Sequence, residues 1–273
     1  MAIKNITIAS RESPLAIWQA KHVQSKINHL YPDIKINIKG FKTQGDILLN
    51  QSLATIGGKG LFIKELEQAL LDKKADLAVH SMKDLPMDIP DEFQLIAITE
   101  REDPRDAFIS NNFNSLDDMP KGTIVGTSSL RRQSQIKAKY PDLIIEPLRG
   151  NLQTRLNKLD KKQYDAIILA AAGLIRLGLK DRIKKYLEIK ISIPAIGQGA
   201  LGIEVLVGNK ELNKMLATLN DDDTSRCVLA ERLVSRSLAG NCTVPLGAYA
   251  SISNDDFIIK GFVASPDGSQ IIH

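Results

Sequence analysis

Short segments with the alternating pattern of β-strands are followed repeatedly by amphipathic helical segments, and this order limits the folds open to the chain. Residues 5–10, NITIAS, alternate as a half-buried strand does. Ser13 and Pro14 follow as a helix N-cap and a first helical residue. Strands that alternate with helices predict an α/β fold with parallel strands and right-handed crossovers. The first helix carries one apolar stripe, formed by Ala16, Ala20, Val23, Ile27 and Leu30.

The strand-and-helix pattern occurs in two series, which predicts two α/β domains. Residues 1–99 hold the first series and residues 105–193 hold the second. The segment at residues 191–205, ISIPAIGQGALGIEV, is rich in Gly and Pro and then returns to a strand pattern. We interpret it as a crossing between two lobes, with residues 200–217 completing domain 1.

A different pattern begins near residue 222 and predicts a small α+β third domain over residues 222–273. A helical segment at residues 224–238 comes first, and the turns SNDD and SPDG then separate alternating strands. Such turns between alternating strands indicate an antiparallel meander. Cys227 lies at the apolar spacing of the helix and is predicted to be a packed thiol.

The composition excludes several classes of function. A net charge of +4 and 5% aromatic residues are too little for a nucleic-acid coat. No apolar run reaches the roughly 18 residues of a membrane span, and the N-terminal segment lacks the apolar core of a secretory signal. The two cysteines make no disulfide framework, and with the four histidines they show no metal-ligand spacing. We therefore expect a cytoplasmic protein that binds no nucleic acid, no membrane and no metal.

Two adjacent arginines, Arg131 and Arg132, lie in the first turn of a predicted helix, after the strand-like segment TIVG. A helix N-terminus already carries partial positive charge, so cations are unfavourable there unless an anion binds. Ligands of α/β sheets bind beyond the carboxyl ends of the strands, where several more polar residues are predicted to lie. These residues are Arg11, Ser13, Ser81, Lys83, Asp84, Thr127, Ser128, Ser129, Arg149, Asn151, Arg155 and Arg176.

This set of cations has two interpretations. The arginines are either solvated or paired with acids of neighbouring elements, or they bind the carboxylates or phosphates of a polyanion. Their grouping at one end of two sheets favours the polyanion, and no Walker-type glycine loop is present.

Asp84 and Cys242 also have alternative interpretations. Asp84 is either a helix cap or partner of Lys83, or a carboxylate that steadies a transient positive charge or moves protons. Cys242 lies in a glycine-rich loop and is either an incidental thiol, a nucleophile or a covalent anchor. No histidine lies near it in the sequence to act as a base, which favours the anchor. His80 is interpreted as a core or surface residue.

A series of segments, in order along the chain, resembles the porphobilinogen deaminase (hydroxymethylbilane synthase) family. The segment ERLVSRSLAGNCTVPLG is similar to the cofactor-attachment signature of that family. The resemblance extends over essentially the whole chain. The other matching segments are SRESPLA, TQGD, GGKGLFIKELE, VHSMKDLP, EREDPRDAF, VGTSSLRRQ, LRGNLQTRL, DAIILAAAGL and PAIGQGALGIE.

The resemblance implies a fold and a reaction. The implied fold has two lobes like type II periplasmic binding proteins, with mixed sheets, and an α+β third domain that bears the cysteine. The implied reaction joins four porphobilinogen molecules head to tail, with release of ammonia, into hydroxymethylbilane for tetrapyrrole and haem biosynthesis. Each pyrrole carries an acetate and a propionate, which would supply the polyanion. The family also implies a monomer, with a dipyrromethane primer attached to Cys242 through a thioether.

The same resemblance assigns roles to individual residues. Asp84 would stabilise the positive charge that forms on pyrrole nitrogens. The residues that would hold carboxylates of the dipyrromethane cofactor are Ser81, Lys83, Ser129, Arg131, Arg132 and Arg155. The residues that would bind the substrate and the growing chain are Arg11, Ser13, Lys59, Phe62, Arg149, Arg176 and Gln198.

Three features depart from the family pattern. Asn241 stands where a glycine is expected before the cysteine, and asparagine tolerates the left-handed backbone better than most residues. Thr55 stands where some relatives have a lysine. The sequence ends at GSQIIH, whereas relatives continue into a further helix, so we expect an exposed apolar face and reduced stability with the two-lobe fold retained.

Three functions are therefore weighed for this sequence. The first is the deaminase, the second is a protein of the same two-lobe build that only binds an anion, and the third is a deaminase fold without activity. The second explains the arginines but leaves Asp84 and Cys242 unexplained. Release of ammonia from porphobilinogen separates the first from the other two.

Overall fold

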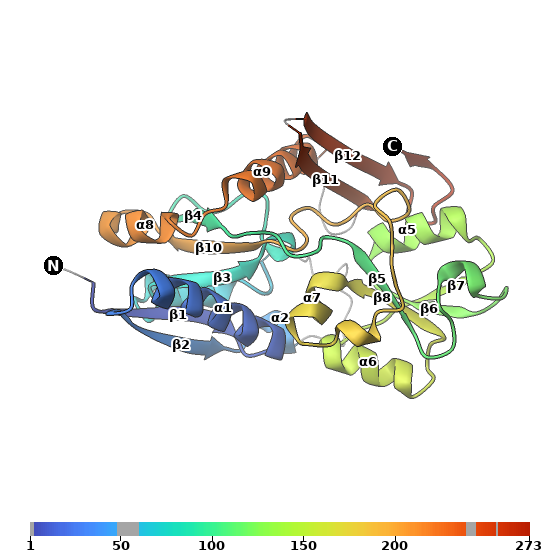
Figure 1. The fold of residues 1–273 in the computed structure, drawn as a ribbon, viewed down its shortest axis with the longest axis horizontal. Helices are drawn as coiled ribbons and strands as arrows, with labels where there is room; N and C mark the ends of the chain where they lie inside the picture. Colours follow the sequence, from blue (N-terminus) through green and yellow to red (C-terminus); the bar gives the residue numbers. More distant parts are fainter. Residues whose placement is uncertain (1–2, 48–59, 239–243, 255) are drawn as a thin grey trace. The chain divides into compact units, whose positions relative to one another are not determined.

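The computed structural model describes residues 3–47, 60–238, 244–254 and 256–273, and Figure 1 labels most of their helices and strands. The chain divides into two compact units. Unit 1 joins Met1–Arg101 to Ala200–Arg226, and unit 2 joins Glu102–Gly199 to Cys227–His273. The chain thus leaves unit 1, builds the first part of unit 2, returns to unit 1 and ends in unit 2.

The sheet of unit 1 is mixed. Its strands are β1 (Asn5–Arg11), β2 (Lys35–Phe41), β3 (Leu77–Ser81), β4 (Phe93–Ile98) and β10 (Leu201–Leu206), in the order β2-β1-β3-β10-β4. Strand β1 pairs in parallel with β2 and β3, whereas β10 is antiparallel to β3 and β4. The carboxyl ends of β1 and β3 therefore lie at one edge of the sheet, and the first residue of β10, Leu201, lies opposite Ser81 at that edge.

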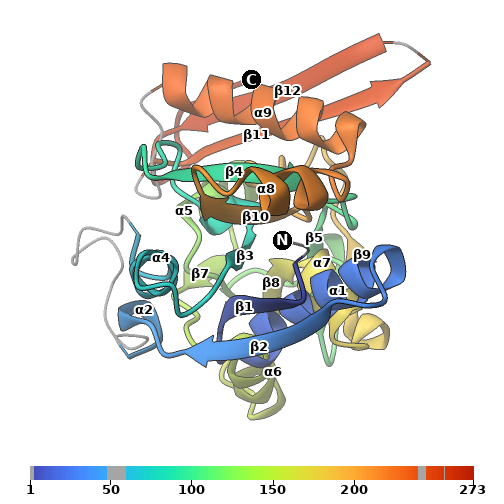
Figure 2. The same cartoon turned by 90° about the vertical axis from the view of Figure 1, so that its left-hand side faces the viewer.

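Helices cover both faces of this sheet. Successive side chains of a strand point to opposite faces, and buried apolar side chains lie on both of them. Helices α1 (Pro14–Leu30) and α8 (Lys210–Ala217) pack on the face that carries Ile8 and Val79, and α4 (Lys64–Leu71) packs on the face of Ala9. Figure 2 shows α1 and α4 on opposite sides of β1 and β3. Two short elements, α2 (Gln44–Ile47) and the one-turn 3₁₀ helix η1 (Met82–Asp84), lead toward the edge where β1 and β3 end.

The first sheet of unit 2 repeats this plan. Its strands are β5 (Asp106–Ser110), β6 (Ile124–Gly126), β7 (Ile144–Glu146), β8 (Ala166–Ala170) and β9 (Lys185–Tyr186), in the order β7-β6-β8-β5-β9. Strand β6 is parallel to β7 and β8, and β5 is antiparallel to β8 and β9. Helices α6 (Leu152–Asp160) and α7 (Ala171–Arg176) cover one face, and α5 (Leu130–Lys139) covers the other. The short helices η2 (Leu116–Asp118) and η3 (Lys180–Arg182) lie in connections.

The last part of the chain adds α9 (Asp222–Ser237) and a three-stranded antiparallel sheet. Its strands are β11 (Leu246–Ser253), β12 (Asp256–Ala264) and β13 (Ile271–Ile272). Glu231 of α9 is fully buried, and its two carboxylate oxygens accept the backbone N–H groups of Gly197 at 2.7 Å and Ala250 at 2.8 Å. One side chain therefore ties α9 to β11 and to the segment that precedes β10.

The fold confirms most of the sequence-based predictions. The α/β class, the two lobes with mixed sheets and the C-terminal meander are all present. The prediction of uniformly parallel strands from the strand–helix alternation is wrong for β5 and β10, which run antiparallel. The stripe on α1 is buried except at Leu30, which is 48% exposed because it lies in the last turn of the helix. Within the described residues no helix is long and apolar enough to span a membrane.

Candidate functional site

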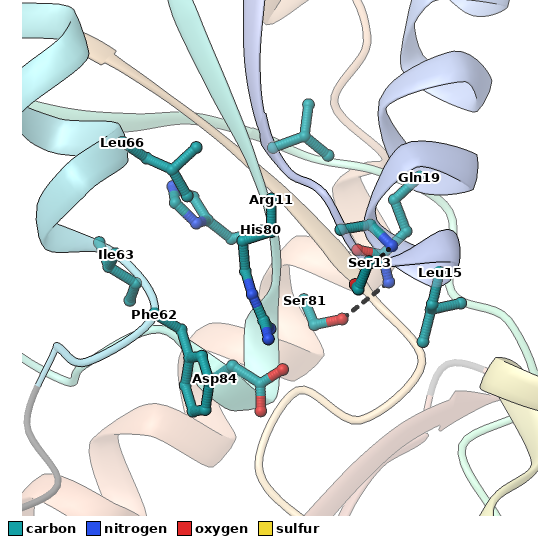
Figure 3. A pocket seen from close by; sticks show the side chains of 12 residues that line it. Arg11, Ser13, Leu15, Gln19, Phe62, Ile63, Leu66, His80, Ser81 and Asp84 are labelled. Atoms are coloured by element: carbon teal, nitrogen blue, oxygen red, sulfur yellow. Dashed lines mark hydrogen bonds between the residues drawn. The ribbon is translucent and has the colours of Figure 1, made fainter. Parts of the chain in front are cut away.

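A pocket of about 60 Å³ lies in unit 1 at the edge where β1 and β3 end. Arg11 is the last residue of β1, and Ser81 is the last residue of β3. Ser13 caps α1 by accepting the backbone N–H of Ala16 at 3.4 Å, as the sequence predicted. Asp84 ends η1 beside this edge. With Phe62, five of the predicted site residues therefore line one pocket, and Figure 3 shows them around it.

Arg11 is already engaged by a carboxylate of the protein. Its Nε donates to Asp46 Oδ2 at 3.2 Å and its Nη2 donates to Oδ1 of the same side chain. The guanidinium carbon lies 4.2 Å from the centroid of the Phe62 ring, a cation–π contact. Thr43 Oγ1 donates to Asp46 Oδ2 at 2.7 Å. Burial alone would raise the pKa of Asp46, but the hydrogen bonds from Arg11 and Thr43 outweigh it and hold that pKa below its ordinary value.

The other residues of the pocket differ in how firmly they are held. Gln19 Nε2 donates to Ser81 Oγ at 2.9 Å, a bond drawn in Figure 3, and this fixes the hydroxyl at the end of β3. Lys83 and Asp84 are exposed. The side chain of Arg11 points toward Asp84 and the Phe62 ring (Figure 3). The pocket thus holds one cation, two hydroxyls and one exposed carboxylate.

Behind Ser81 lies a buried pair of titratable side chains. His80 Nε2 and Glu204 Oε2 are 2.8 Å apart, and the two side chains are 4% and 0% exposed. His80 is therefore a core residue, one of the two placements that the sequence allowed. On the neighbouring helix α4, burial and the charge of Glu204 raise the pKa of Glu67.

In unit 2, Arg131 and Arg132 both bind Asp106, the first residue of β5. Arg131 donates from Nη1 to Asp106 Oδ2 at 2.8 Å and from Nη2 to Oδ1 at 3.1 Å. Arg132 donates to Oδ1 from Nε at 3.0 Å and from Nη2 at 2.8 Å. Ser192 Oγ at 2.7 Å and Gln198 Nε2 at 2.9 Å complete the surroundings of this carboxylate. We call Asp106, Arg131, Arg132, Ser192 and Gln198 the Asp106 cluster.

The Asp106 cluster answers part of the question raised by two arginines at a helix N-terminus. Asp106 is fully buried and both arginines are 6% exposed. Burial alone would raise the pKa of Asp106, but the charges of Arg131 and Arg132 hold it far below its ordinary value. One anion that the arginines need is therefore a protein side chain, as the pairing interpretation expected.

Sequence reasoning did not select Asp106 because it searched only the residues that follow strands. Strand β5 runs antiparallel to β8, and Asp106 lies opposite Ala170, the last residue of β8. The first residue of an antiparallel strand thus reaches the edge where the parallel strands end. The motif EREDPRDAF contained Asp106 but gave no sign of the direction of β5.

The remaining predicted residues occupy several positions in unit 2. Ser129 caps α5 by accepting the backbone N–H of Arg132 at 3.4 Å. Arg155 Nε donates to the carbonyl oxygen of Gly150 at 2.8 Å, and the Arg149 side chain is partly exposed. Arg176 Nη2 donates to the carbonyl oxygen of Gly199 at 2.6 Å, and burial lowers the pKa of Arg176 to about 10.

Lys59 and Cys242 lie outside the described residues, as do Thr55 and Asn241. Within unit 1 the structure brings together Arg11, Ser13, Phe62, Ser81 and Asp84, and within unit 2 it brings together Arg131, Arg132 and Gln198. Cys227, predicted to be packed, is 6% exposed.

Comparisons with known proteins agree with the sequence motifs. The family model "Porphobilinogen deaminase, dipyromethane cofactor binding domain" matches residues 6–214, and "Porphobilinogen deaminase, C-terminal domain" matches residues 225–273. A porphobilinogen deaminase of Thiobacillus denitrificans is 59% identical over 267 residues, which is 98% of this chain and 87% of the relative. One of Methylobacillus flagellatus is 59% identical over 271 residues, which is 99% of this chain and 87% of the relative.

Solved structures with similar folds include a methionine binding protein and a lipoprotein, both of low sequence identity. The methionine binding protein MetQ aligns with a TM-score of 0.50 and 13% identity over 86% of this chain and 96% of its own. The lipoprotein Tp32 of Treponema pallidum aligns with a TM-score of 0.50 and 13% identity, over 87% of this chain and 95% of its own. At this identity the likeness concerns the fold alone, and it agrees with two lobes of the periplasmic-binding-protein type.

Proposed function

The chain belongs to the porphobilinogen deaminase family, and from that premise we propose that it joins four porphobilinogen molecules head to tail. Each addition releases ammonia, and the product is hydroxymethylbilane, a precursor in tetrapyrrole and haem biosynthesis. The observation that supports this function in the structure is the pocket of unit 1, where the exposed carboxylate of Asp84 lies among Arg11, Ser13 and Ser81. Such a pocket can bind substrate carboxylates and still offer one negative charge to a cation.

Asp84 is proposed as the catalytic carboxylate. Loss of ammonia from the aminomethyl group leaves positive charge on the pyrrole, and an ionised carboxylate stabilises that charge electrostatically. Asp84 lies at the end of η1, directly beyond β3, so the sheet fixes the backbone that carries it. It is the acid among the residues that line the pocket. A carboxylate in this position favours the transition state, in which the pyrrole ring becomes positively charged, over the ground state, in which the ring is uncharged.

The family implies a dipyrromethane cofactor joined to Cys242, and the donor groups of this chain fit it. Its acetates and propionates would be held by the guanidinium, ammonium and hydroxyl groups of Ser81, Lys83, Ser129, Arg131, Arg132 and Arg155, which are the groups that bind carboxylates. When bound, the cofactor supplies the pyrrole end to which the first substrate is joined. The residues of the chain bind and orient its carboxylates.

The substrate and the growing chain are proposed to bind Arg11, Ser13, Lys59, Phe62, Arg149, Arg176 and Gln198. At Arg11 a substrate carboxylate would compete with Asp46 for the Nε and Nη2 edge of the guanidinium. In this structure Gln198 Nε2 donates to Asp106 and to the carbonyl oxygen of Pro104 at 2.6 Å.

We further propose a cytoplasmic monomer with porphobilinogen as its small-molecule partner and with no nucleic-acid or membrane partner. Residues 222–273 are proposed to form a third domain that carries the cofactor cysteine. The absence of metal-ligand spacing in the sequence supports a reaction without a metal.

Ammonia release from porphobilinogen by the purified chain tests this function directly. We expect Asp84→Asn to lower kcat by about 10²–10³-fold, the usual effect of removing one group that stabilises transition-state charge. Asp88→Asn is the matched control, because Asp88 is an exposed carboxylate four residues further along. A full rate in Asp84→Asn contradicts the role of Asp84. A wild-type chain that releases no ammonia contradicts the activity and supports an anion-binding or inactive protein.

Intact-protein mass spectrometry tests the cofactor. We expect a mass excess of one dipyrromethane on the chain purified from a haem-producing host, or after addition of porphobilinogen. The variant Cys242→Ser should lack this excess. The same excess on Cys242→Ser would contradict the proposed anchor.

A further inference from the structure

We infer that Asp106 is a positioning residue: it fixes Arg131 and Arg132 as one receptor with a net charge of +1, suited to a single carboxylate of the primer. The inference rests on the proposed function. It assigns a role to a residue that does not itself have to touch the cofactor.

The first step is the geometry of the two guanidiniums. Arg131 presents its terminal edge, Nη1 and Nη2, to Asp106, and its Nη1 also donates to the carbonyl oxygen of Ile193 at 2.5 Å. Arg132 presents its Nε and Nη2 edge instead, and its Nη1 donates to the carbonyl oxygen of Ile168 at 3.1 Å. One carboxylate thus holds two different edges, which fixes the relative orientation of the two planes.

The second step is the count of donors. Two guanidiniums carry about ten N–H groups, and hydrogen bonds to Asp106, Ile168 and Ile193 use six of them. Within the described part of the chain, the Nε–H of Arg131 and one N–H on its Nη2 have no acceptor. These two N–H groups form the side edge of the guanidinium, an arrangement that matches the two oxygens of a carboxylate.

The third step is the charge balance. Asp106 is the one carboxylate that pairs with either arginine among the described residues, so two cations share one anion. Both arginines are 6% exposed, and little water is available to screen the remaining charge. Burial lowers the pKa of Arg131; the charge of Asp106 opposes this shift, and the nearby charge of Arg132 adds to it. A purely structural ion pair needs no excess of positive charge, whereas a ligand carboxylate would neutralise it.

The fourth step is the rigidity of Asp106 itself. Ser192 and Gln198 donate to its two oxygens, and β5 is paired with β8 at this residue. The arginines are therefore ordered when the chain folds and not when the ligand binds, which reduces the entropy lost on binding.

The test compares two buried serines of unit 2. Ser192→Ala removes a donor to Asp106 and keeps all three charges, while Ser110→Ala removes a hydroxyl that donates to the carbonyl oxygen of Asp165 at 2.6 Å. Ser192 and Ser110 are 0% and 2% exposed, so the two variants lose similar packing. We measure thermal stability, the rate of mass gain when porphobilinogen is added to unloaded chain, and KM for porphobilinogen after loading.

We expect Ser192→Ala to load about three- to tenfold more slowly than Ser110→Ala at equal stability, with an unchanged KM once loaded. Asp106→Asn, if folded, should load at least about 100-fold more slowly, since it loses the charge as well as the geometry. Equal loading rates for the two serine variants would overturn the inference and leave Asp106 a structural residue. A wild-type chain that never gains the mass would overturn the proposed function itself.

Discussion

Each unit contains an arginine–aspartate contact at the edge where its parallel strands end, but the two contacts differ in burial. In unit 1 the side chains of Arg11 and Asp46 are 23% and 17% exposed. In unit 2 the side chains of Arg131 and Asp106 are 6% and 0% exposed, and Arg132 shares the same aspartate. A partly exposed pair gives little net stability and exchanges readily with a competing anion. A fully buried cluster cannot lose its carboxylate without leaving an unpaired charge.

The comparison separates two uses of the same chemistry. Asp46 occupies Arg11 in the way that a substrate carboxylate would, so we expect it to be displaced when substrate binds. Asp106 holds Arg131 and Arg132 in place, so we expect it to remain whether or not a ligand is bound. Substitutions at Asp46 should therefore change binding more than stability, and substitutions at Asp106 should change both.

The largest expected effect is on the stability of unit 2. Asp106→Asn should lower the free energy of unfolding by about 3–5 kcal/mol, because two buried cations lose their partner. Asp46→Asn should lower it by at most about 1 kcal/mol, as for other exposed pairs. Urea unfolding followed by circular dichroism measures both values. Equal losses in the two variants would contradict the difference between the contacts.

The stability should depend on pH more strongly through Asp106 than through Asp46. In the folded protein the pKa of Asp106 is far below the value of about 3.9 that it has in the unfolded chain. The stabilisation of the fold by ionised Asp106 is therefore fully present above the pKa of the unfolded state, and it is lost as the pH falls toward the pKa of the folded state. The difference in unfolding free energy between wild type and Asp106→Asn should narrow between about pH 5 and about pH 3. The pKa of Asp46 is also lowered, so the difference in unfolding free energy between wild type and Asp46→Asn should also narrow as the pH falls, by a smaller amount.

A substitution beside Arg11 tests the contact of unit 1 directly. A Cβ on Gly45 would overlap the Phe62 ring, so Gly45→Ala must displace the ring from its contact with the guanidinium of Arg11. We expect a loss of about 1–3 kcal/mol in stability, as for other overpacked sites. We also expect a raised KM for porphobilinogen, measured by steady-state ammonia release. An unchanged KM would show that Phe62 contributes nothing to the position of Arg11.

The smallest expected effect is a gain in binding. Asp46→Asn removes the carboxylate that competes for Arg11, so KM for porphobilinogen should fall by about two- to fivefold, within the range of a surface ion pair. Thr43→Val is a useful companion, because it removes a hydrogen bond to Asp46 but keeps its charge. A rise in KM for Asp46→Asn would show that Asp46 positions Arg11 and does not compete with substrate.

The sequence predicted the fold and the strand-end residues well because both depend on local patterns. The alternation in residues 5–10, the N-cap at Ser13 and the turns of the C-terminal meander are each local signals, and each is confirmed. The residues after β1 and β3 meet at one pocket because parallel strands end at one edge. Local patterns thus identified Arg11, Ser13, Ser81 and Asp84 as neighbours.

Non-local pairing explains what the sequence did not predict. Asp106 lies 25 residues before Arg131, and no local pattern gives the direction of β5. Asp46 is 35 residues from Arg11, and its role depends on where α2 lies beside β1. His80 and Glu204 are 124 residues apart and meet because the chain returns to unit 1 after residue 199 and β10 then pairs with β3. Each of these contacts depends on strand order, which local periodicity does not encode.

Glu231 has a consequence for the modularity of the molecule. Its carboxylate accepts one N–H from β11 and another from the segment before β10, so the small sheet and that segment share an acceptor that neither contains. Excision of the small sheet would leave a buried carboxylate with a missing donor, and grafting of the sheet onto another scaffold would leave the Ala250 amide without its acceptor. We therefore expect the C-terminal sheet, α9 and the segment before β10 to be exchanged as one piece, with recombination breakpoints in this family avoiding the interval from Gly197 to Ala250.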